Sequence, residues 1–480
     1  MRLDAAALPY DRARATPGIV HIGLGGFHRA HMARYAHDLM AIDPDGLGWG
    51  IVGAGLREAD RPLLDALARQ DGLYTLTERD AGGETLTVIG SILRVIDASA
   101  STAALLDAIA DPAIRIVSLT VTEHGYCLDR ATRRLDMHHD AIAHDLMRPH
   151  DPKSAIGVIV EALQRRRTSG LPAFTALSCD NIRHNGDVLA GAALALARAR
   201  DPALAAWIAR EARFPNAMVD RITPVPRPTD AAALRSRTGI EDAAPLMAET
   251  FRQWVIEDRF AGGRPAWEEV GAQCVADVAP YETMKLRLLN ASHLAVAGLG
   301  QLAGFTGIAE AIGHPLIRRH MEALMERETG PTLDAVPGVD LPAYRRSLVE
   351  RFANPAIPDT VERVNADAPL NYLLDPVRER LAAGAGLPLL ALALAAWLRR
   401  ARGENEAGGP VPVHHPLAGE MRARAITGGP DPAPLLAMKA LFGDLGADAR
   451  LHAAVAPWLA SLYEVGAIAT LDRAATRGLL

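Results

Sequence analysis

A lysine, an amide and an imidazole are concentrated in residues 285–293, a stretch with the pattern of a helix. At about 100° per residue, Lys285, His293 and Asn290 fall at roughly 0°, 80° and 140° around such a helix. They therefore share one side of it, and leucines lie on or near the same side. Placing three polar groups in apolar surroundings costs free energy unless the groups are used. We expect this stretch to carry chemistry.

The lysine is the most informative of the three, because the chain otherwise uses arginine. Of 51 basic residues, only Lys153, Lys285 and Lys439 are lysines. Arginine keeps its proton in proteins, whereas a desolvated lysine can lose it. Lys285 is therefore a candidate general base. The plain alternative is a lysine on an amphipathic helix, with its stem packed and its ammonium group in water.

A glycine turn near the N-terminus indicates a dinucleotide-binding loop. Residues 18–31 have the pattern of a short β-branched strand, a glycine turn and the start of a helix, which is the context that such a loop requires. Gly23 would make the tight turn, and Gly25 would let the backbone approach a pyrophosphate at the helix N-terminus. His28 stands where a third glycine is usual. The residues expected at the cofactor here are Gly23, Gly25, Gly26, Phe27 and His28.

A carboxylate after the second expected strand indicates which dinucleotide is bound. The strand is Trp49–Gly53, and it is followed by Arg57, Glu58, Asp60 and Arg61. A carboxylate at this place holds the hydroxyls of the adenosine ribose and repels a 2′-phosphate. Asp60 or Glu58 can serve, which favours NAD over NADP. Arg57 and Asp60 are the residues expected at the cofactor here, although Arg57 and Arg61 could instead accept a phosphate. The alternative is a helix N-terminus with solvated side chains.

Polar side chains follow two further expected strands. The β-branched run Ile114–Val121 leads into Thr122 and Glu123, and the run Ala173–Leu177 is soon followed by Asn181. Ligands of open α/β sheets bind at the carboxyl ends of the strands. Thr122 and Glu123 are therefore expected at the cofactor, and Asn181 presents a second amide to the same crevice. The commoner role of such an asparagine is a turn or a helix cap.

The pattern of expected secondary structure changes near residue 280. Before it, expected strands alternate with helices, and after it, Ala/Leu/Arg-rich helical patterns are broken by proline turns. We therefore predict an α/β fold with a Rossmann-type dinucleotide-binding domain over 1–280 and a mostly α-helical substrate and catalytic domain over 281–480. Further expected elements are the strands Leu73–Thr77 and Thr85–Ile89 and the helices Ala30–Met40 and Ala155–Arg166.

Composition narrows the class of partner. The chain has 480 residues, 49% of them hydrophobic, and a net charge of −6, which gives no reason to expect nucleic acid or an anionic membrane. The three cysteines form neither a disulfide framework nor a zinc pattern, so a reducing cytoplasm is expected. The first residues contain no apolar signal core, and the longest apolar run, Leu387–Leu398, is too short to span a bilayer.

Several stretches, in this order and at these separations, resemble the mannitol dehydrogenase family of polyol-specific long-chain dehydrogenases/reductases. The similarity spans nearly the whole chain and weakens after about residue 365. The resemblance implies a Rossmann-type N-terminal domain, a helical C-terminal domain and an NAD-dependent, zinc-independent polyol/ketose oxidoreductase. The matching stretches are 18–31, 53–61, 116–126, 178–186, 214–224, 253–258 and 285–293.

The resemblance also implies roles for residues in the stretch 285–293 and for Asn181. The general base of the family falls on Lys285, and its substrate-orienting histidine falls on His293. Its two oxyanion-binding asparagines fall on Asn181 and Asn290. No metal ligand is implied.

Substrate contacts of the family fall on Asp220 and Arg363, and its ribose-binding aspartate falls on Asp60. Taken alone, Asp220 beside Arg221 has the pattern of surface charge. The run after Arg363, residues 364–370, is shorter than in many members and lacks a lysine that they place near the substrate. The identity of the substrate is therefore the least determined feature.

The leading hypothesis is interconversion of D-mannitol and D-fructose with NAD as cofactor. The nearest rival is a hexuronate reductase of the same family acting on fructuronate or tagaturonate, because arginines could bind the added carboxylate; arabinitol and sorbitol are further candidate substrates. A non-catalytic NAD or sugar sensor is the remote alternative, since a fold does not fix a function. The Lys/Asn/Asn/His set argues against a sensor, because a sensor needs no deprotonatable lysine. Relatives of this kind are often monomeric and the sequence shows no coiled-coil heptads, so a monomer is compatible with it.

Overall fold

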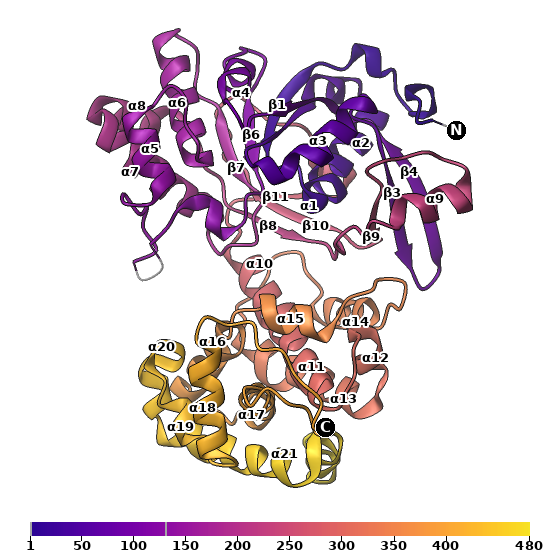
Figure 1. The fold of residues 1–480 in the computed structure, drawn as a ribbon, viewed down its shortest axis with the longest axis vertical. Coiled ribbons are helices and arrows are strands. Elements are labelled where there is room, and N and C mark those ends of the chain that lie inside the picture. The colour runs from indigo at the N-terminus through magenta and orange to yellow at the C-terminus, as the bar shows by residue number, and fades with distance from the viewer. Residues whose placement is uncertain (1, 130–131) are drawn as a thin grey trace. The chain divides into compact units, whose positions relative to one another are not determined.

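The computed structural model describes residues 2–129 and 132–480 (Figure 1). Its contacts divide the chain into two compact units, Met1–Ala279 and Pro280–Leu480.

Within the described part of the first unit, the central sheet has five parallel strands in the order β5-β2-β1-β6-β7. The chain winds outward from β1 in both directions, which is the doubly wound arrangement of a Rossmann-type domain. The predicted α/β class is confirmed. The strands are β1 (Pro17–Ile22), β2 (Gly50–Gly55), β5 (Ile92–Asp97), β6 (Ile116–Leu119) and β7 (Thr175–Ser178).

Both faces of this sheet are buried, which explains why its strands are nearly continuous apolar runs. Successive residues of a strand point to opposite faces. Ile51 accordingly packs with the core that contains α2 and α3, whereas Val52 packs with the core that contains α4, α6 and α7. The helices of this unit are α1 (Gly26–Ala30), α2 (Met32–Ile42), α3 (Arg61–Arg69), α4 (Ala103–Ile109), α5 (Asp140–Met147), α6 (Ala155–Thr168), α7 (Asn185–Arg200), α8 (Pro202–Glu211) and α9 (Asp230–Thr238).

Two smaller sheets complete the described part of the first unit. One contains the expected runs near residues 73–77 and 85–89 as an antiparallel hairpin, in the order β4-β3-β9; the other has the order β11-β10-β8. The sequence did not predict β5 or the strands β8 to β11. The strands are β3 (Tyr74–Asp80), β4 (Gly83–Ile89), β8 (Ala217–Asp220), β9 (Leu246–Glu249), β10 (Gln253–Glu257) and β11 (Gln273–Val275).

The second unit is helical and is built around α11, which packs against α12, α13, α15 and α17. Helix α17 corresponds to the long apolar run of the sequence and is buried from Leu389 onward. The helices are α10 (Ala279–Met284), α11 (Ala291–Leu302), α12 (Ile308–Gly313), α13 (Pro315–Leu324), α14 (Leu341–Phe352), α15 (Val361–Asp367), α16 (Asn371–Ala382), α17 (Pro388–Arg400), α18 (Ala418–Gly428), α19 (Ala433–Leu436), α20 (Lys439–Phe442) and α21 (Ala449–Thr476).

Helix α21 is the described helix that is long and apolar enough to cross a membrane by length and composition, and 44% of its most apolar window is buried. It is interrupted by Gly466, whose φ of 84° and ψ of 177° are not helical. Its contacts with α17 mark it as a core helix of this unit.

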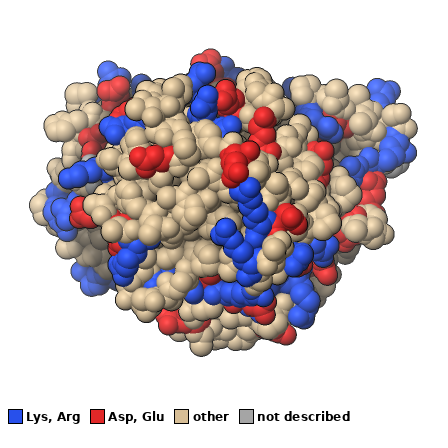
Figure 2. Space-filling model, turned by 90° about the horizontal axis from the view of Figure 1, so that it is seen from below, with Lys and Arg blue, Asp and Glu red and all other residues tan. Residues whose placement is uncertain are grey.

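On the face drawn in Figure 2, basic and acidic side chains are scattered among a larger area of other residues, and several Lys or Arg lie beside Asp or Glu. This mixture matches the many short ion pairs of the described residues, such as Arg318–Glu322 at 3.1 Å and Arg424–Glu420 at 2.8 Å. A single-sign field of the kind that attracts nucleic acid is not seen on this face.

Candidate functional site

The glycine turn lies at the carboxyl end of β1 and opens α1. Gly23 has a φ of 92°, and a Cβ there would lie 2.1 Å from the carbonyl oxygen of Thr120, so only glycine fits. A Cβ on Gly25 would meet nothing closer than 3.9 Å, which leaves space beside the backbone. Gly26 is the first residue of α1. A turn with this free space at a helix N-terminus fits the pyrophosphate of a dinucleotide.

The residue in place of the third glycine, His28, points into the protein. It is 1% exposed, and its ring stacks on that of His21 with centroids 3.4 Å apart. Burial holds the pKa of His28 well below its ordinary value, so the ring is neutral. Neither of its ring nitrogens has a hydrogen-bond partner among the described residues. The neighbouring Phe27 stacks on His31 with centroids 4.9 Å apart.

Asp60 is the better placed of the two carboxylates considered for the ribose. It lies against Gly55 at the carboxyl end of β2, and its side chain is 18% exposed, whereas Glu58 is exposed. Asp60 accepts a hydrogen bond from Arg57 Nη2 at 2.6 Å. Arg61 pairs with Asp97 at 2.9 Å, so it is directed away from Asp60.

The ends of β6 and β7 are joined by Asp180, a residue that sequence reasoning missed. Its carboxylate accepts hydrogen bonds from the backbone N–H of Val121 at 3.1 Å, that of Thr122 at 2.8 Å and the hydroxyl of Tyr126 at 2.8 Å. Burial raises the pKa of Asp180. Thr122 has a φ of 62°, which is strained for a β-branched residue. Asp180, which directly precedes Asn181 in the sequence, therefore holds the backbone of Thr122 in place.

The predicted cofactor residues and Asn181 lie at one edge of the central sheet, because β1, β2, β6 and β7 are parallel and end there. Glu123 lies on this edge in an exposed ion pair with Arg133. Backbone bonds connect the strand ends: the N–H of Gly23 donates to Ala54 at 2.8 Å, and the N–H of Cys179 donates to Leu119 at 2.9 Å. The edge is the carboxyl side of the sheet, where nucleotide ligands bind.

Asp220 ends β8 and is 5% exposed, and Arg221 is equally buried, so the interpretation of this pair as surface charge is wrong. Asn185 connects this strand to β7: its amide donates to the carbonyl of Asp180 at 3.0 Å and to that of Ala217 at 2.7 Å, and it accepts from the N–H of Ala217 at 2.9 Å.

In the second unit, the stretch that carries Lys285 and Asn290 is a π-helical turn. It covers Lys285–Asn290 and is continuous with α10 and α11. A π-turn closes hydrogen bonds between residues five apart, so Lys285 and Asn290 lie closer to one line along the helix than the predicted 140°. The prediction of an ordinary α-helix at 100° per residue is therefore wrong for Lys285–Asn290, which form a π-turn instead. Turns of this kind occur frequently at functional sites.

Lys285 is 7% exposed, which contradicts the alternative of an ammonium group in open water. Asn290, one π-turn later, has a buried side-chain oxygen with no hydrogen-bond partner among the described residues. A buried polar atom left without a partner is costly and is typical of a site that completes its hydrogen bonds with a ligand.

His293 and Arg363 converge on Asp359, a second residue that sequence reasoning missed. His293 Nε2 lies 3.5 Å from the Asp359 carboxylate, and the imidazole stacks on Phe352 with centroids 4.3 Å apart. Arg363 donates to both oxygens of Asp359, at 2.7 Å and 2.6 Å. The only signal in the sequence is the spacing of four between Asp359 and Arg363.

Among the described residues, no group of three or more His, Cys, Asp or Glu is arranged to hold a metal ion. The polar groups at the carboxyl edge of the first unit and on the π-turn of the second unit are instead suited to hydrogen bonding and proton transfer.

A parallel sheet in this strand order, with a glycine turn at its carboxyl edge, defines a Rossmann-type domain. The family model for the mannitol dehydrogenase Rossmann domain matches residues 17–269, and that for the mannitol dehydrogenase C-terminal domain matches residues 277–463. The chain belongs to the mannitol dehydrogenase family, and it is an oxidoreductase of the class that acts on polyols and sugar acids. The resemblance seen in the sequence is confirmed.

Similar proteins include three kinds of enzyme. D-mannonate oxidoreductase from Escherichia coli is 44% identical over 474 residues, which cover 97% of each chain. A structure titled Pseudomonas fluorescens mannitol 2-dehydrogenase ternary complex with NAD and D-mannitol is 41% identical, with a TM-score of 0.88 and coverage of 99% of this chain and 100% of that one. A structure of D-sorbitol dehydrogenase in substrate-free form is 37% identical, with a TM-score of 0.88 and 96% coverage of both chains.

Proposed function

We propose that the chain is a metal-independent oxidoreductase that interconverts D-mannitol and D-fructose with NAD as cofactor. The observation that carries this proposal is the π-turn, on which buried Lys285 and an amide with an unpartnered oxygen, Asn290, occur five residues apart. NAD is supported by the free space at Gly25, by the carboxylate of Asp60 and by the relative solved with NAD and D-mannitol.

Oxidation of a secondary alcohol requires that its hydroxyl proton be accepted and that the developing alkoxide be stabilised. Neutral Lys285 accepts the proton, and its ammonium form returns it to the carbonyl oxygen during reduction. Asn181 and Asn290 donate hydrogen bonds to the oxygen on which charge develops, an effect worth roughly 3–4 kcal/mol per donor. NAD, when bound, supplies the hydride acceptor.

The remaining residues orient the substrate. His293 is held by Phe352 and Asp359, so its ring has a fixed direction from which to contact a substrate hydroxyl. Asp220 and Arg363 are proposed to bind the other hydroxyls. We assign NAD binding to residues 1–280 and the substrate and catalytic helices to residues 281–480.

We further propose that the enzyme is monomeric and cytoplasmic. The cytoplasm fits the three free cysteines, since Cys127 and Cys179 are buried as thiols and burial raises their pKa.

The second candidate function is oxidation of D-mannonate, which corresponds to reduction of fructuronate in the other direction. The identity of 44% to D-mannonate oxidoreductase favours it. The geometry of Arg363 favours the neutral polyol, because its guanidinium is already neutralised by the two hydrogen bonds to Asp359. A substrate carboxylate needs a cation that is free to pair with it.

A substrate panel tests the proposal. Consumption of NADH and of NADPH is measured with D-fructose, D-fructuronate and D-tagaturonate, and reduction of NAD is measured with D-mannitol, D-sorbitol, D-arabinitol and D-mannonate. The proposal expects the highest kcat/KM for D-fructose and D-mannitol with NAD(H). A higher kcat/KM for fructuronate and D-mannonate establishes the second candidate instead, and no turnover with any of these substrates contradicts both.

A further inference from the structure

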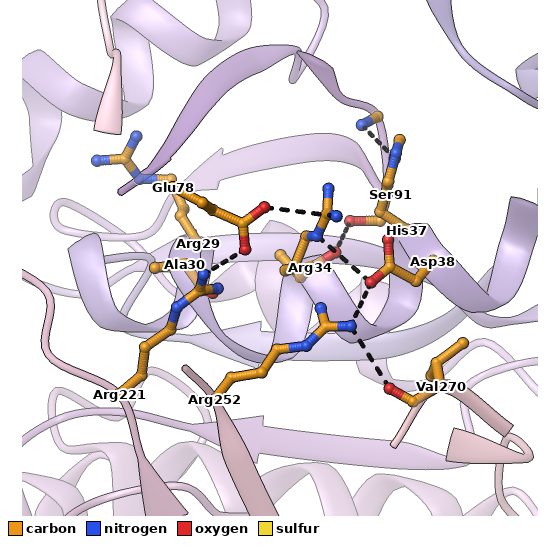
Figure 3. A network of polar contacts seen from close by, with 12 residues as sticks. Arg29, Ala30, Arg34, His37, Asp38, Glu78, Ser91, Arg221, Arg252 and Val270 are labelled. Carbon is orange, nitrogen blue, oxygen red and sulfur yellow. Dashed lines mark hydrogen bonds and ion pairs between the residues drawn. The ribbon is translucent and has the colours of Figure 1, made fainter. Parts of the chain in front are cut away.

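Arg221 directly follows the predicted substrate residue Asp220, and its side chain is completely buried. Its guanidinium contacts three separate segments, and Figure 3 shows it beside Glu78 and Ala30. It donates to the backbone carbonyl of Ala30, to a carboxylate oxygen of Glu78, and to the carbonyl of Glu249 from both Nε at 3.0 Å and Nη2 at 2.7 Å.

The partners of Arg221 lie at informative places in the first unit. Ala30 is the last residue of α1, the one-turn helix that begins at the glycine turn. Glu249 ends β9, and its carboxylate accepts the N–H of Ile222 at 2.6 Å. Arg221 is thereby bonded to the helix that follows the glycine turn, and Ile222 is bonded to the end of β9.

A planar guanidinium is required for this arrangement. Four bonds leave it in three directions, which uses the fork geometry that arginine has and lysine lacks. Glu78 supplies the opposite charge that lets the cation be buried. Glu78 also pairs with Arg34 at 3.4 Å, so the acid is itself held in place.

Figure 3 also shows a second group of contacts near Arg221. This group reaches neither the helix after the glycine turn nor the strand that ends at Asp220. Arg34 and Arg252 both pair with Asp38 on α2, at 3.3 Å and 2.6 Å. The Arg34–Asp38 pair lies within α2, and the Arg252–Asp38 pair links α2 to the residue before β10. Among the described residues, no side-chain contact of Arg34 or Arg252 is to α1 or to β8. Arg34 therefore provides a matched control within the same network.

We propose that Arg221 is a positioning residue that couples the glycine turn to Asp220, so that a dinucleotide bound at the turn sets the carboxylate of Asp220 for the substrate. This inference rests on the proposed function, because it assigns cofactor and substrate to the two ends of the contact. Binding at one end of a shared rigid element changes affinity at the other, and the coupling is reciprocal.

The test measures the coupling itself in the full-length chain. D-mannitol is titrated by calorimetry with and without NADH, a pair that cannot turn over, and D-mannonate is titrated in parallel. We expect NADH to tighten sugar binding by about tenfold in the wild type. The quantity compared is the ratio of the sugar Kd without NADH to the sugar Kd with NADH. Arg221→Lys keeps the positive charge near Glu78 but loses the forked guanidinium, so this ratio should fall to near one while circular dichroism shows a folded chain.

Arg34→Lys is the matched control, and it should keep the wild-type ratio. The inference is overturned if Arg221→Lys keeps the ratio, if Arg34→Lys loses as much of it, or if NADH has no effect on sugar binding in the wild type. The melting temperature separates coupling from stability, since a merely structural role lowers it without changing the ratio. A wild-type chain that binds neither NADH nor sugar refutes the proposed function first; binding of both with an unchanged ratio in Arg221→Lys refutes only the coupling.

Discussion

Mild acid should destabilise the first unit, because several of its histidines are buried in their neutral form. Burial lowers the pKa of His21, His31 and His37 from 6.5 to about 3 in each case. When the chain unfolds, these imidazoles become exposed and take up protons below pH 6.5. The unfolded state therefore binds more protons than the folded state between about pH 3 and 6.5, and stability is lost as the pH falls through this window.

The size of the effect follows from the pKa difference. At pH 5.5, one histidine with an unfolded pKa of 6.5 and a folded pKa near 3 costs about 1.4 kcal/mol relative to neutral pH. His21, His31 and His37 together cost about 4 kcal/mol, which is a large part of the 5–15 kcal/mol by which domains are typically stable. The fully buried His28, whose pKa is also lowered by burial, adds to the same trend.

Urea unfolding of the full-length chain at pH 7.5 and pH 5.5, followed by tryptophan fluorescence, measures this loss. His37 accepts hydrogen bonds at Nδ1 from the Tyr10 hydroxyl at 3.0 Å and from the N–H of Gly90 at 3.3 Å. His37→Gln removes the titrating group, so its pH-dependent loss should be smaller than that of the wild type by about 1.4 kcal/mol. The exposed His138 is the matched control, and His138→Gln should behave as the wild type does. If the wild type and His37→Gln lost equal stability between pH 7.5 and pH 5.5, burial of neutral His37 would not be a cause of the acid sensitivity.

Two further predictions concern carboxylates. Burial raises the pKa of Glu328 from 4.5 to about 7, so its contribution to stability is complete below pH 4.5 and is lost as the pH rises through 7, at a cost of about 3 kcal/mol by pH 8. Glu328→Gln should therefore lose less stability than the wild type between pH 6 and pH 8 in the same urea assay, and an unchanged slope would contradict the assignment. Asp60→Asn removes the charge that repels a 2′-phosphate, so the ratio of kcat/KM for NADP to that for NAD should rise by about tenfold. A ratio equal to that of the wild type would show that Asp60 does not contact the ribose.

The sequence predicted the features that depend on local pattern. The central strands β1, β2, β6 and β7 lie within buried, mainly apolar runs, and the glycine turn follows the first of them, so these strands and the turn were found. Strand β5 was missed because polar residues interrupt its apolar pattern, and the strands β8 to β11 were missed because their few apolar residues form a strand only when a partner strand pairs with them.

The sequence predicted the residue types of the candidate site, but it did not predict the π-turn or the buried residues that hold the site in place. The π-turn cannot be seen from the sequence, because Lys285–Asn290 has the same apolar spacing as an ordinary helix. Asp180, Asp359 and Arg221 have the pattern of turn or surface residues, and their importance comes from hydrogen bonds to distant segments, such as that from Arg221 to Ala30 across 191 residues. Such contacts depend on tertiary structure, which no local pattern specifies.

Proton transfer is assigned to Lys285, and replacing this residue is the decisive experiment. NADH-dependent reduction of D-fructose is measured for Lys285→Ala and for Lys439→Ala, in which one of the few other lysines, an exposed one, is removed. We expect Lys285→Ala to lower kcat by about 10²–10⁴-fold while NADH binding is retained, and we expect Lys439→Ala to keep wild-type activity. Turnover of Lys285→Ala near that of the wild type would contradict this assignment.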